Sequence, residues 1–241
     1  MNIMKPVGLK TFQEYATIVF LPYIKAQLAN VKWLDIIWDV HRLDSLKSTT
    51  RVKLGKCVRR RVAATHSIPG NWQEFLRVDD NNTEFLAHQV MDNVPIEKEV
   101  YSTCGDHVLC FCVDRDVSTL APCSHDTRKL LHDMDAVGKG YNQIMLRIVD
   151  TDVVVLAVST VVLLENTQLW IVFGTGKHLR YIPAHQIATS LSAEKAHVLS
   201  MFHAFTGCNT ASSFARKGKK TAFDSWKSFD AVTVFFARLV T

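Results

Sequence analysis

Two aspartates, Asp150 and Asp152, close an apolar stretch of the chain and are the residues best suited to chemistry. The strand predicted before them is apolar on both faces, as strands of parallel sheets are, through Ile144, Leu146, Ile148 and Val149. Ligands of such sheets bind at the carboxyl ends of the strands. Two neighbouring carboxylates repel each other and lose hydration on burial, and a bound divalent cation relieves both penalties. The pair therefore predicts a Mg²⁺ or Mn²⁺ site, and the simpler alternative is an N-cap for the next helix.

Basic residues are concentrated in two short stretches. The first has seven basic residues and no acidic one: Lys47, Arg51, Lys53, Lys56, Arg59, Arg60 and Arg61. The second consists of Arg216, Lys217, Lys219 and Lys220. Such clusters suit a phosphate backbone, because each neutralised phosphate releases counterions. Together with the acidic pair they favour a nucleic acid as partner, with DNA the first expectation. The alternatives are an ordinary solvated surface and, for Arg59–Arg61, a nuclear localisation signal.

The elements expected around these residues alternate between helix and strand. Helices are predicted over Thr11–Val31 (capped by Thr11 and bent at Pro22), Ser45–Arg61, Gln73–Asn93, Asp126–Gly140, His185–Leu191 and Ala193–Phe205. Strands are predicted at Leu34–Val40, in one or two pieces within Val100–Val113, and at Ile144–Asp150, Leu169–Phe173 and Leu179–Ile182. This order indicates an α/β fold with a mainly parallel sheet flanked by helices.

Composition limits the class of protein. The 241 residues are 48% hydrophobic and 21% charged, with a net charge of +5, as in a globular protein with a sizeable core. No signal peptide opens the chain, and the longest apolar run, Val153–Leu164, is about half of a membrane span. The six cysteines lack a secreted-type framework. We therefore expect an intracellular protein with free thiols and no membrane partner.

Three motifs in the sequence lack the residues or the spacing that their chemistry requires. Gly174–Lys177 lacks the first glycine and the final Ser or Thr of a phosphate loop, and it predicts a hairpin turn. The cysteines around Cys110 lack the paired spacing of a zinc site. Ser124–Asp126 are adjacent in sequence, so they cannot form a catalytic triad. The five tryptophans are expected to pack in the core or at its edge rather than to stack on bases.

The sequence resembles the flap-endonuclease family in three segments. In Ile36–Asp39, followed by the basic stretch to Arg61, it resembles the strand that delivers a metal-binding Asp and the basic arch that follows. Val149–Asp152 is similar to that family's paired aspartates, and Thr206–Thr210 to its Gly-Cys-Asp segment. The resemblance implies a single PIN-like nuclease domain over residues 1–241. It also implies Asp39, Asp150 and Asp152 as catalytic ligands of Mg²⁺, joined by Asp126 and Asn209.

The whole chain is more similar still to a multicopy group of uncharacterised animal proteins, associated with mobile elements, that carry this PIN-like domain. Relative to that group, the chain lacks Glu-Glu-Ala between His125 and Asp126, and Asn209 stands where the flap endonucleases have Asp. The family's first strand and its carboxyl-terminal helical segment also have no counterpart, so we expect a domain truncated at both ends. Two-metal hydrolysis needs about four or more carboxylates, and this set offers three principal ones, Asp39, Asp150 and Asp152, with Asp126 only assisting, so it implies a single ion or none.

Three functions therefore remain open from the sequence. The first is a weak or degenerate Mg²⁺-dependent, structure-specific nuclease. The second is a noncatalytic nucleic-acid-binding remnant of a mobile-element protein. The third is a purely structural α/β protein.

Overall fold

A computed structural model describes residues 5–38, 62–75, 97–104, 107–111, 125–207 and 218–240. Two compact units divide the chain, Met1–Arg128 and Lys129–Thr241. Both combine helices with a small sheet, so the predicted α/β class is confirmed. Among the described residues, no helix is long and apolar enough to cross a membrane.

The first unit opens with a helix whose start is fixed by its sequence. Thr11 forms a capping box with Glu14: the Glu14 N–H donates to the Thr11 hydroxyl at 3.2 Å, and the Glu14 carboxylate accepts from the Thr11 N–H. The N–H groups of Lys10 and Thr11 that donate to this carboxylate lower the pKa of Glu14. The predicted cap is therefore confirmed.

The first helix changes from α-helical to π-helical hydrogen bonding shortly before Pro22. It passes from α1 (Phe12–Tyr15) through a π-helical turn, η1 (Ala16–Phe20), into α2 (Leu21–Leu28). Proline lacks the N–H that continues the α-helical bonding, and the wider turn directly precedes it. The proline predicted to bend the helix thus marks a change of helix type.

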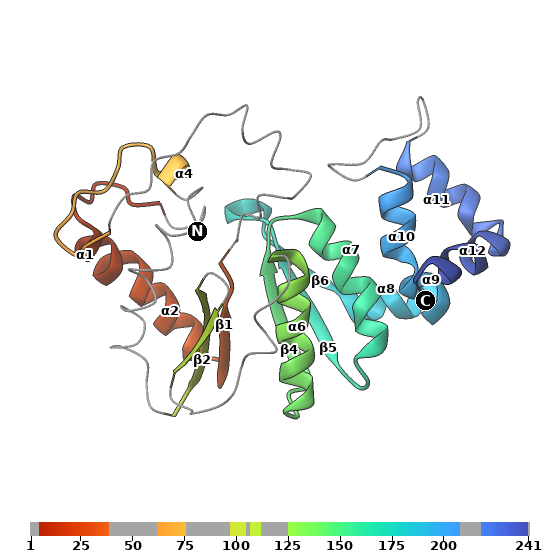
Figure 1. Cartoon of the computed structure of the whole chain (residues 1–241), viewed down its shortest axis with the longest axis horizontal. Helices are drawn as coiled ribbons and strands as arrows, with labels where there is room; N and C mark the ends of the chain where they lie inside the picture. Colours follow the sequence, from red (N-terminus) through yellow and green to blue (C-terminus); the bar gives the residue numbers. More distant parts are fainter. Residues whose placement is uncertain are drawn as a thin grey trace. The chain divides into compact units, whose positions relative to one another are not determined.

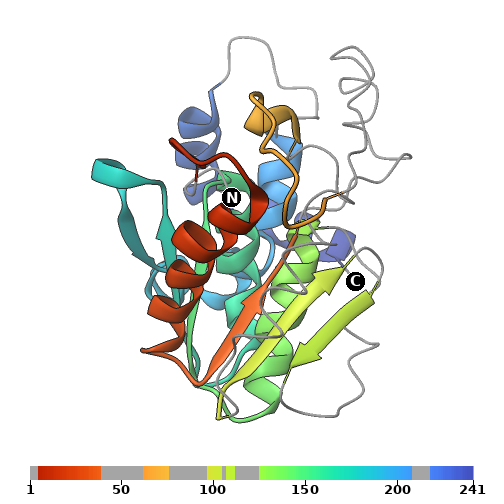
Figure 2. The same cartoon turned by 90° about the vertical axis from the view of Figure 1, so that its left-hand side faces the viewer.

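The sheet of the first unit has three strands in the order β1 (Trp33–Ile36), β2 (Glu99–Cys104) and β3 (His107–Phe111). β1 and β2 are parallel, whereas β2 and β3 are antiparallel. Figure 2 shows α2 running along one side of this sheet. The core joins the helix to the sheet and to α4 (Trp72–Phe75) through Phe12, Tyr15, Phe20, Ile24, Leu28, Trp38, Trp72, Phe75 and Val100.

The sheet of the second unit repeats this mixed pattern. Its order is β4 (Gln143–Ile148), β5 (Gln168–Phe173) and β6 (Arg180–Pro183). β4 and β5 are parallel, and β5 and β6 form the predicted antiparallel hairpin. The expectation of a mainly parallel sheet is therefore wrong for the described strands. Its physical reason is that short loops return β3 and β6 directly beside the preceding strands, and a parallel neighbour needs a long crossover.

Helices surround this second sheet (Figure 1). α7 (Thr151–Thr160), continued by η3 (Val161–Leu163), follows β4, and α8 (Ala184–Leu191) follows β6. Leu146, Leu169, Ile171, Val153 and Ala188 form the centre of one buried cluster of sheet and helices. α6 (His125–Gly138) contributes Leu130 to the same cluster and ends before Gly140, whose positive φ of 88° confirms the predicted stop.

One strand departs from its predicted environment. β4 buries Leu146 and Ile148 on one face, but Met145 and Val149 are 61% and 56% exposed. The strand is therefore not apolar and buried on both faces as expected. β4 pairs with β5 alone among the described strands, which makes it an edge strand of its unit.

A helical cluster closes the second unit. It contains α9 (Ala193–His197), α10 (Leu199–Phe205), α11 (Lys219–Lys227) and α12 (Asp230–Val240). Phe202 stacks on Trp226, with ring centroids 4.5 Å apart, and the Trp226 Nε1–H donates to the Thr233 hydroxyl at 2.9 Å. Trp38, Trp72 and Trp226 are all buried, which confirms the predicted packing role for these three.

Candidate functional site

The acidic pair lies at the carboxyl end of β4, where the chain turns into α7. Asp150 is the N-cap of α7: its backbone is extended and its Oδ1 accepts a hydrogen bond from the Asp152 N–H at 2.9 Å. This arrangement satisfies one of the backbone donors that a helix leaves unpaired at its start. The simpler alternative for Asp150, an N-cap, is thus confirmed.

Asp152 stands in the first turn of α7 and contacts a histidine from α10. Its Oδ1 lies 2.9 Å from His203 Nε2, and both side chains are about one fifth exposed. His203 Nδ1 in turn lies 2.8 Å from Lys219 Nζ at the start of α11. Three helices therefore meet in a chain of polar contacts, Asp152–His203–Lys219.

The directions of the hydrogen bonds between Asp152, His203 and Lys219 follow from the charge of the lysine. An ammonium group can only donate, so His203 Nδ1 accepts the hydrogen bond from Lys219. A neutral imidazole then carries its hydrogen on Nε2 and donates it to the Asp152 carboxylate. His203 therefore holds Asp152 in one orientation, as groups behind a ligating carboxylate do in metal sites.

A hairpin lies at the same edge of the sheet. Because β4 and β5 are parallel, their carboxyl ends coincide, and the Gly174 N–H donates to the Ile148 carbonyl at 3.2 Å. The turn between β5 and β6 contains η4 (Gly176–His178), and Figure 1 shows it at the end of the sheet where α7 begins. The acidic pair and this turn thus share one edge of one unit.

The two aspartates fit a hard cation in chemistry, and their geometry limits how they could hold it. Carboxylate oxygen is the donor that Mg²⁺ prefers. Asp150 uses Oδ1 for the helix cap, and within the described part of the chain its Oδ2 accepts no hydrogen bond. Asp152 has its Oδ1 committed to His203. Asp150 is therefore suited to contact an ion through its Oδ2.

The remaining predicted ligands lie outside what the structure describes. Asp39 and Asn209 are outside the described residues. Asp126 lies in the first turn of α6, but its side chain is not described. Within the described residues, no three His, Cys, Asp or Glu side chains form a group able to hold a metal ion. Only Asp150 and Asp152 are brought together here.

Most of the predicted nucleic-acid contacts also fall outside the described residues, namely Lys47, Arg51, Lys53, Lys56, Arg59, Arg60, Arg61, Arg216 and Lys217. Lys219 and Lys220 are described. Lys219 contacts His203, and Lys220 forms an exposed ion pair with Asp224 at 2.9 Å. Of these two, Lys219 is the one that the structure connects to the acidic pair.

His203 is the residue that sequence reasoning missed. It is a lone histidine within the helical segment Leu199–Phe205, and such a residue gives no signal of its own. Its partner lies 51 positions earlier in the chain, so only the packing of α10 beside α7 reveals the contact. No family model matches this chain, and no curated protein or solved structure matches it either.

Proposed function

We propose that this chain is a weak or degenerate metal-dependent nuclease domain of PIN-like type that acts on nucleic-acid phosphodiesters. The observation that carries the proposal is the placement of Asp150 and Asp152 at the carboxyl end of β4, with His203 behind Asp152. That edge is where α/β sheets bind their ligands. The resemblance to flap endonucleases in Val149–Asp152 points to the same two residues.

Asp150 and Asp152 are the proposed ligands of one Mg²⁺ or Mn²⁺ ion, and the resemblance to flap endonucleases would add Asp39, with Asp126 and Asn209 assisting. A bound ion would supply a more acidic water molecule and offset charge on the phosphate. Two residues of the chain have defined roles beside such an ion. Asp150 fixes the first turn of α7 as its cap, and His203 orients Asp152 through its Nε2–H.

Low activity follows from the ligand count. Three principal carboxylates, with Asp126 and the Asn209 amide only assisting, suit a single ion held mostly through water. Losing a second ion removes several kcal/mol of transition-state stabilisation, which corresponds to a rate lower by about a thousandfold or more.

One observation favours a second candidate, a noncatalytic nucleic-acid-binding domain that descends from a mobile-element protein. Both aspartates already have structural roles, Asp150 as a cap and Asp152 as the acceptor for His203. Carboxylates with such roles can persist without any metal chemistry.

A cleavage assay separates the two candidates. The full chain and the variant Asp152→Asn are incubated with branched and single-stranded DNA in Mg²⁺ and in Mn²⁺. Slow cleavage that the variant loses supports the nuclease. Binding without cleavage in the parent chain, unchanged in the variant, supports the noncatalytic domain.

A further inference from the structure

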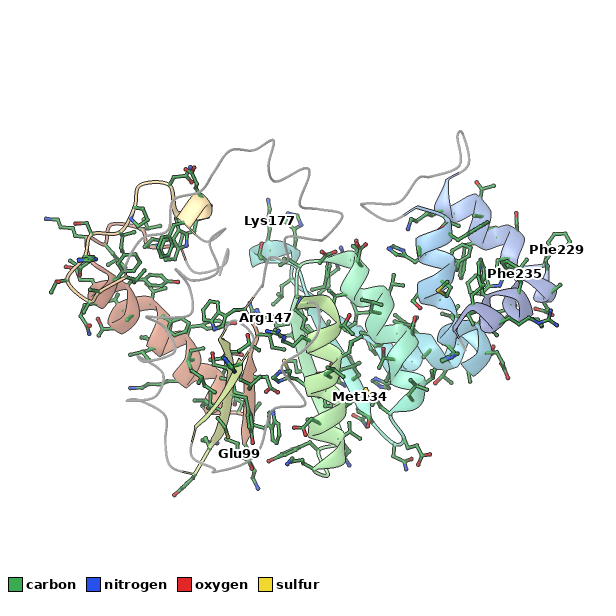
Figure 3. All side chains as sticks on the ribbon, in the orientation of Figure 1. Glu99, Met134, Arg147, Lys177, Phe229 and Phe235 are labelled. Carbon is green, nitrogen blue, oxygen red and sulfur yellow. The ribbon has the colours of Figure 1, made fainter. Side chains whose placement is uncertain are left out.

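The turn of the β5–β6 hairpin is a third basic feature of the chain, distinct from the two clusters seen in sequence. It carries Lys177, His178 and, at the start of β6, Arg180, and all three are exposed. No acidic residue occurs between Glu165 and Glu194, so the hairpin has no carboxylate of its own. Figure 3 shows the Lys177 side chain extending from the turn into solvent.

Lys177 and Arg180 differ from Lys195, Lys220 and Lys227 of the same unit in having no acidic partner among the described residues. Lys220 and Lys227 both contact Asp224, at 2.9 and 3.8 Å, and Lys195 contacts Asp230 at 3.0 Å. Within the described residues, neither Lys177 nor Arg180 lies within ion-pair distance of a carboxylate. Arg180 is restrained instead by the Phe173 ring, whose centroid is 5.8 Å from its guanidinium carbon. Two positive charges are therefore available to an outside anion.

The backbone of the turn holds these side chains in a defined place. The His178 N–H donates to the Thr175 carbonyl and the Leu179 N–H to the Gly176 carbonyl, at 3.1 and 3.2 Å. Gly174, with φ of 89°, brings the chain so close that an added Cβ would lie 2.6 Å from the His178 carbonyl oxygen. The turn is therefore tightly folded. The hydrogen bond from the Gly174 N–H to the Ile148 carbonyl connects it to the end of β4.

We propose that this hairpin, defined by Lys177 and Arg180, is a phosphate-contacting surface that binds the backbone of a nucleic-acid strand at the edge carrying Asp150 and Asp152. The proposal rests on the proposed function, because it names the element that would hold the strand beside the acidic pair. Charge complementarity selects a polyanion, since the surface offers two cations and no competing carboxylate. This proposal does not depend on the phosphate-loop motif rejected above. It requires the charges of the Lys177 and Arg180 side chains, whereas a phosphate loop binds phosphate through its backbone N–H groups.

The chemistry of the turn favours nucleic acid over an anionic membrane. Surfaces that insert into lipid present Trp, Phe or Leu beside their basic residues. Here the exposed part of the turn consists of Thr175, Gly176, Lys177 and His178, and Leu179 is partly buried. The exposed large side chain beside Arg180 is Tyr181, which carries a polar hydroxyl. The turn therefore offers contacts to phosphates but little apolar surface to a bilayer.

The test measures binding of a short fluorescein-labelled single strand to the full chain by anisotropy, in EDTA and over a series of salt concentrations. The double variant Lys177→Ala/Arg180→Ala is compared with Lys195→Ala/Lys227→Ala, which removes the same charge from lysines that contact Asp230 and Asp224 and lie outside both basic clusters. Two lost contacts with a single strand lower the salt slope by about 1.4 and the affinity at 0.1 M salt by about twentyfold. The control pair should lose less than about threefold, because its charges are offset already.

Several results overturn the proposal. They are a parent chain that does not bind the strand, a hairpin variant within about threefold of the parent, and equal losses in the two double variants. Tighter binding of anionic phospholipid vesicles, lost in the hairpin variant while strand binding is kept, would assign the surface to a membrane instead. Circular dichroism confirms that both variants fold.

The variant Asp150→Asn, tested in the same assay, separates this surface from the metal site. Because the strand is bound without metal, Asp150→Asn, which removes a negative charge from this edge, should not weaken binding in EDTA. A hairpin effect without any Mg²⁺ binding would remove the proposed nuclease and keep the surface. Mg²⁺ binding without a hairpin effect would do the reverse.

Discussion

At the scale of single residues, the acidic pair combines a structural role with a proposed chemical one. Asp150 caps α7 through one oxygen, and His203 orients Asp152. The structural role explains why a sequence can keep both residues even if catalysis is lost. A substitution that separates the two roles is therefore more informative than a deletion of the side chain.

Asn caps a helix about as well as Asp but has no charge, so Asp150→Asn should leave stability almost unchanged while weakening a bound cation. Asp150→Ala loses the cap as well and should lower the free energy of unfolding by about 1 kcal/mol. Urea denaturation of both variants checks this prediction. Equal losses in both would mean that the hydrogen bond to the Asp152 N–H is not what stabilises this helix start.

Gly174 is the second residue with a sharp expectation. Its positive φ and the 2.6 Å approach of the His178 carbonyl oxygen leave no room for a side chain. Gly174→Ala should therefore destabilise the chain by about 2 kcal/mol or more.

Gly138 offers the matched control for Gly174. It ends α6 with nothing within 4 Å of an added Cβ, so Gly138→Ala should be neutral or slightly stabilising. Thermal melts of the two variants decide the matter. Similar melting temperatures for Gly174→Ala and Gly138→Ala would show that the backbone around Gly174 can shift to accept a side chain.

At the scale of elements, the sequence predicted where helices and strands lie better than how they are arranged. Thr11, Gly140 and the β5–β6 turn gave local signals, a cap, a stop and a hairpin, because each acts through its immediate neighbours. The mixed sheets and the exposed face of β4 did not follow from periodicity, since the pairing of strands depends on distant parts of the chain. The same limit hid His203, whose partner lies in another helix.

The cluster of α10, α11 and α12 permits a test of what holds these elements together. Phe202 is 7% exposed and stacks on Trp226, so Phe202→Ala should cost about 3–5 kcal/mol. Phe235 on α12 is 55% exposed, and Figure 3 shows it on the outer side of these helices. Phe235→Ala should cost less than about 1 kcal/mol.

Chemical denaturation followed by far-UV circular dichroism measures both effects. A small loss in Phe202→Ala would contradict the stacked cluster as the source of stability for these three helices.

At the scale of the whole molecule, the proposed function assigns binding and chemistry to different residues. The basic clusters and the hairpin do not need the carboxylates, and a net charge of +5 favours a polyanionic partner. Affinity for nucleic acid should therefore survive even where cleavage has been lost. Both candidates, the degenerate nuclease and the noncatalytic binding domain, predict that nucleic-acid binding does not require the carboxylates.

Nucleic-acid affinity should accordingly fall steeply with salt between about 50 and 200 mM, because counterion release drives phosphate contacts. Six such contacts to duplex DNA would lower the affinity by about a thousandfold over that range. Fluorescence anisotropy with duplex DNA at several salt concentrations provides the slope. An affinity that stays flat would mean that the basic stretches are ordinary surface.

The central claim is that Asp150 and Asp152 belong to a divalent-metal site, and calorimetric titration with Mg²⁺ tests it most directly. The parent chain is compared with Asp150→Asn, which keeps the helix cap, and with Glu165→Gln, which removes an exposed carboxylate elsewhere in the same unit. We expect the parent and Glu165→Gln to bind Mg²⁺ equally, and Asp150→Asn to bind it at least about tenfold more weakly. Equal affinity in all three proteins, or no binding by the parent, would contradict the claim.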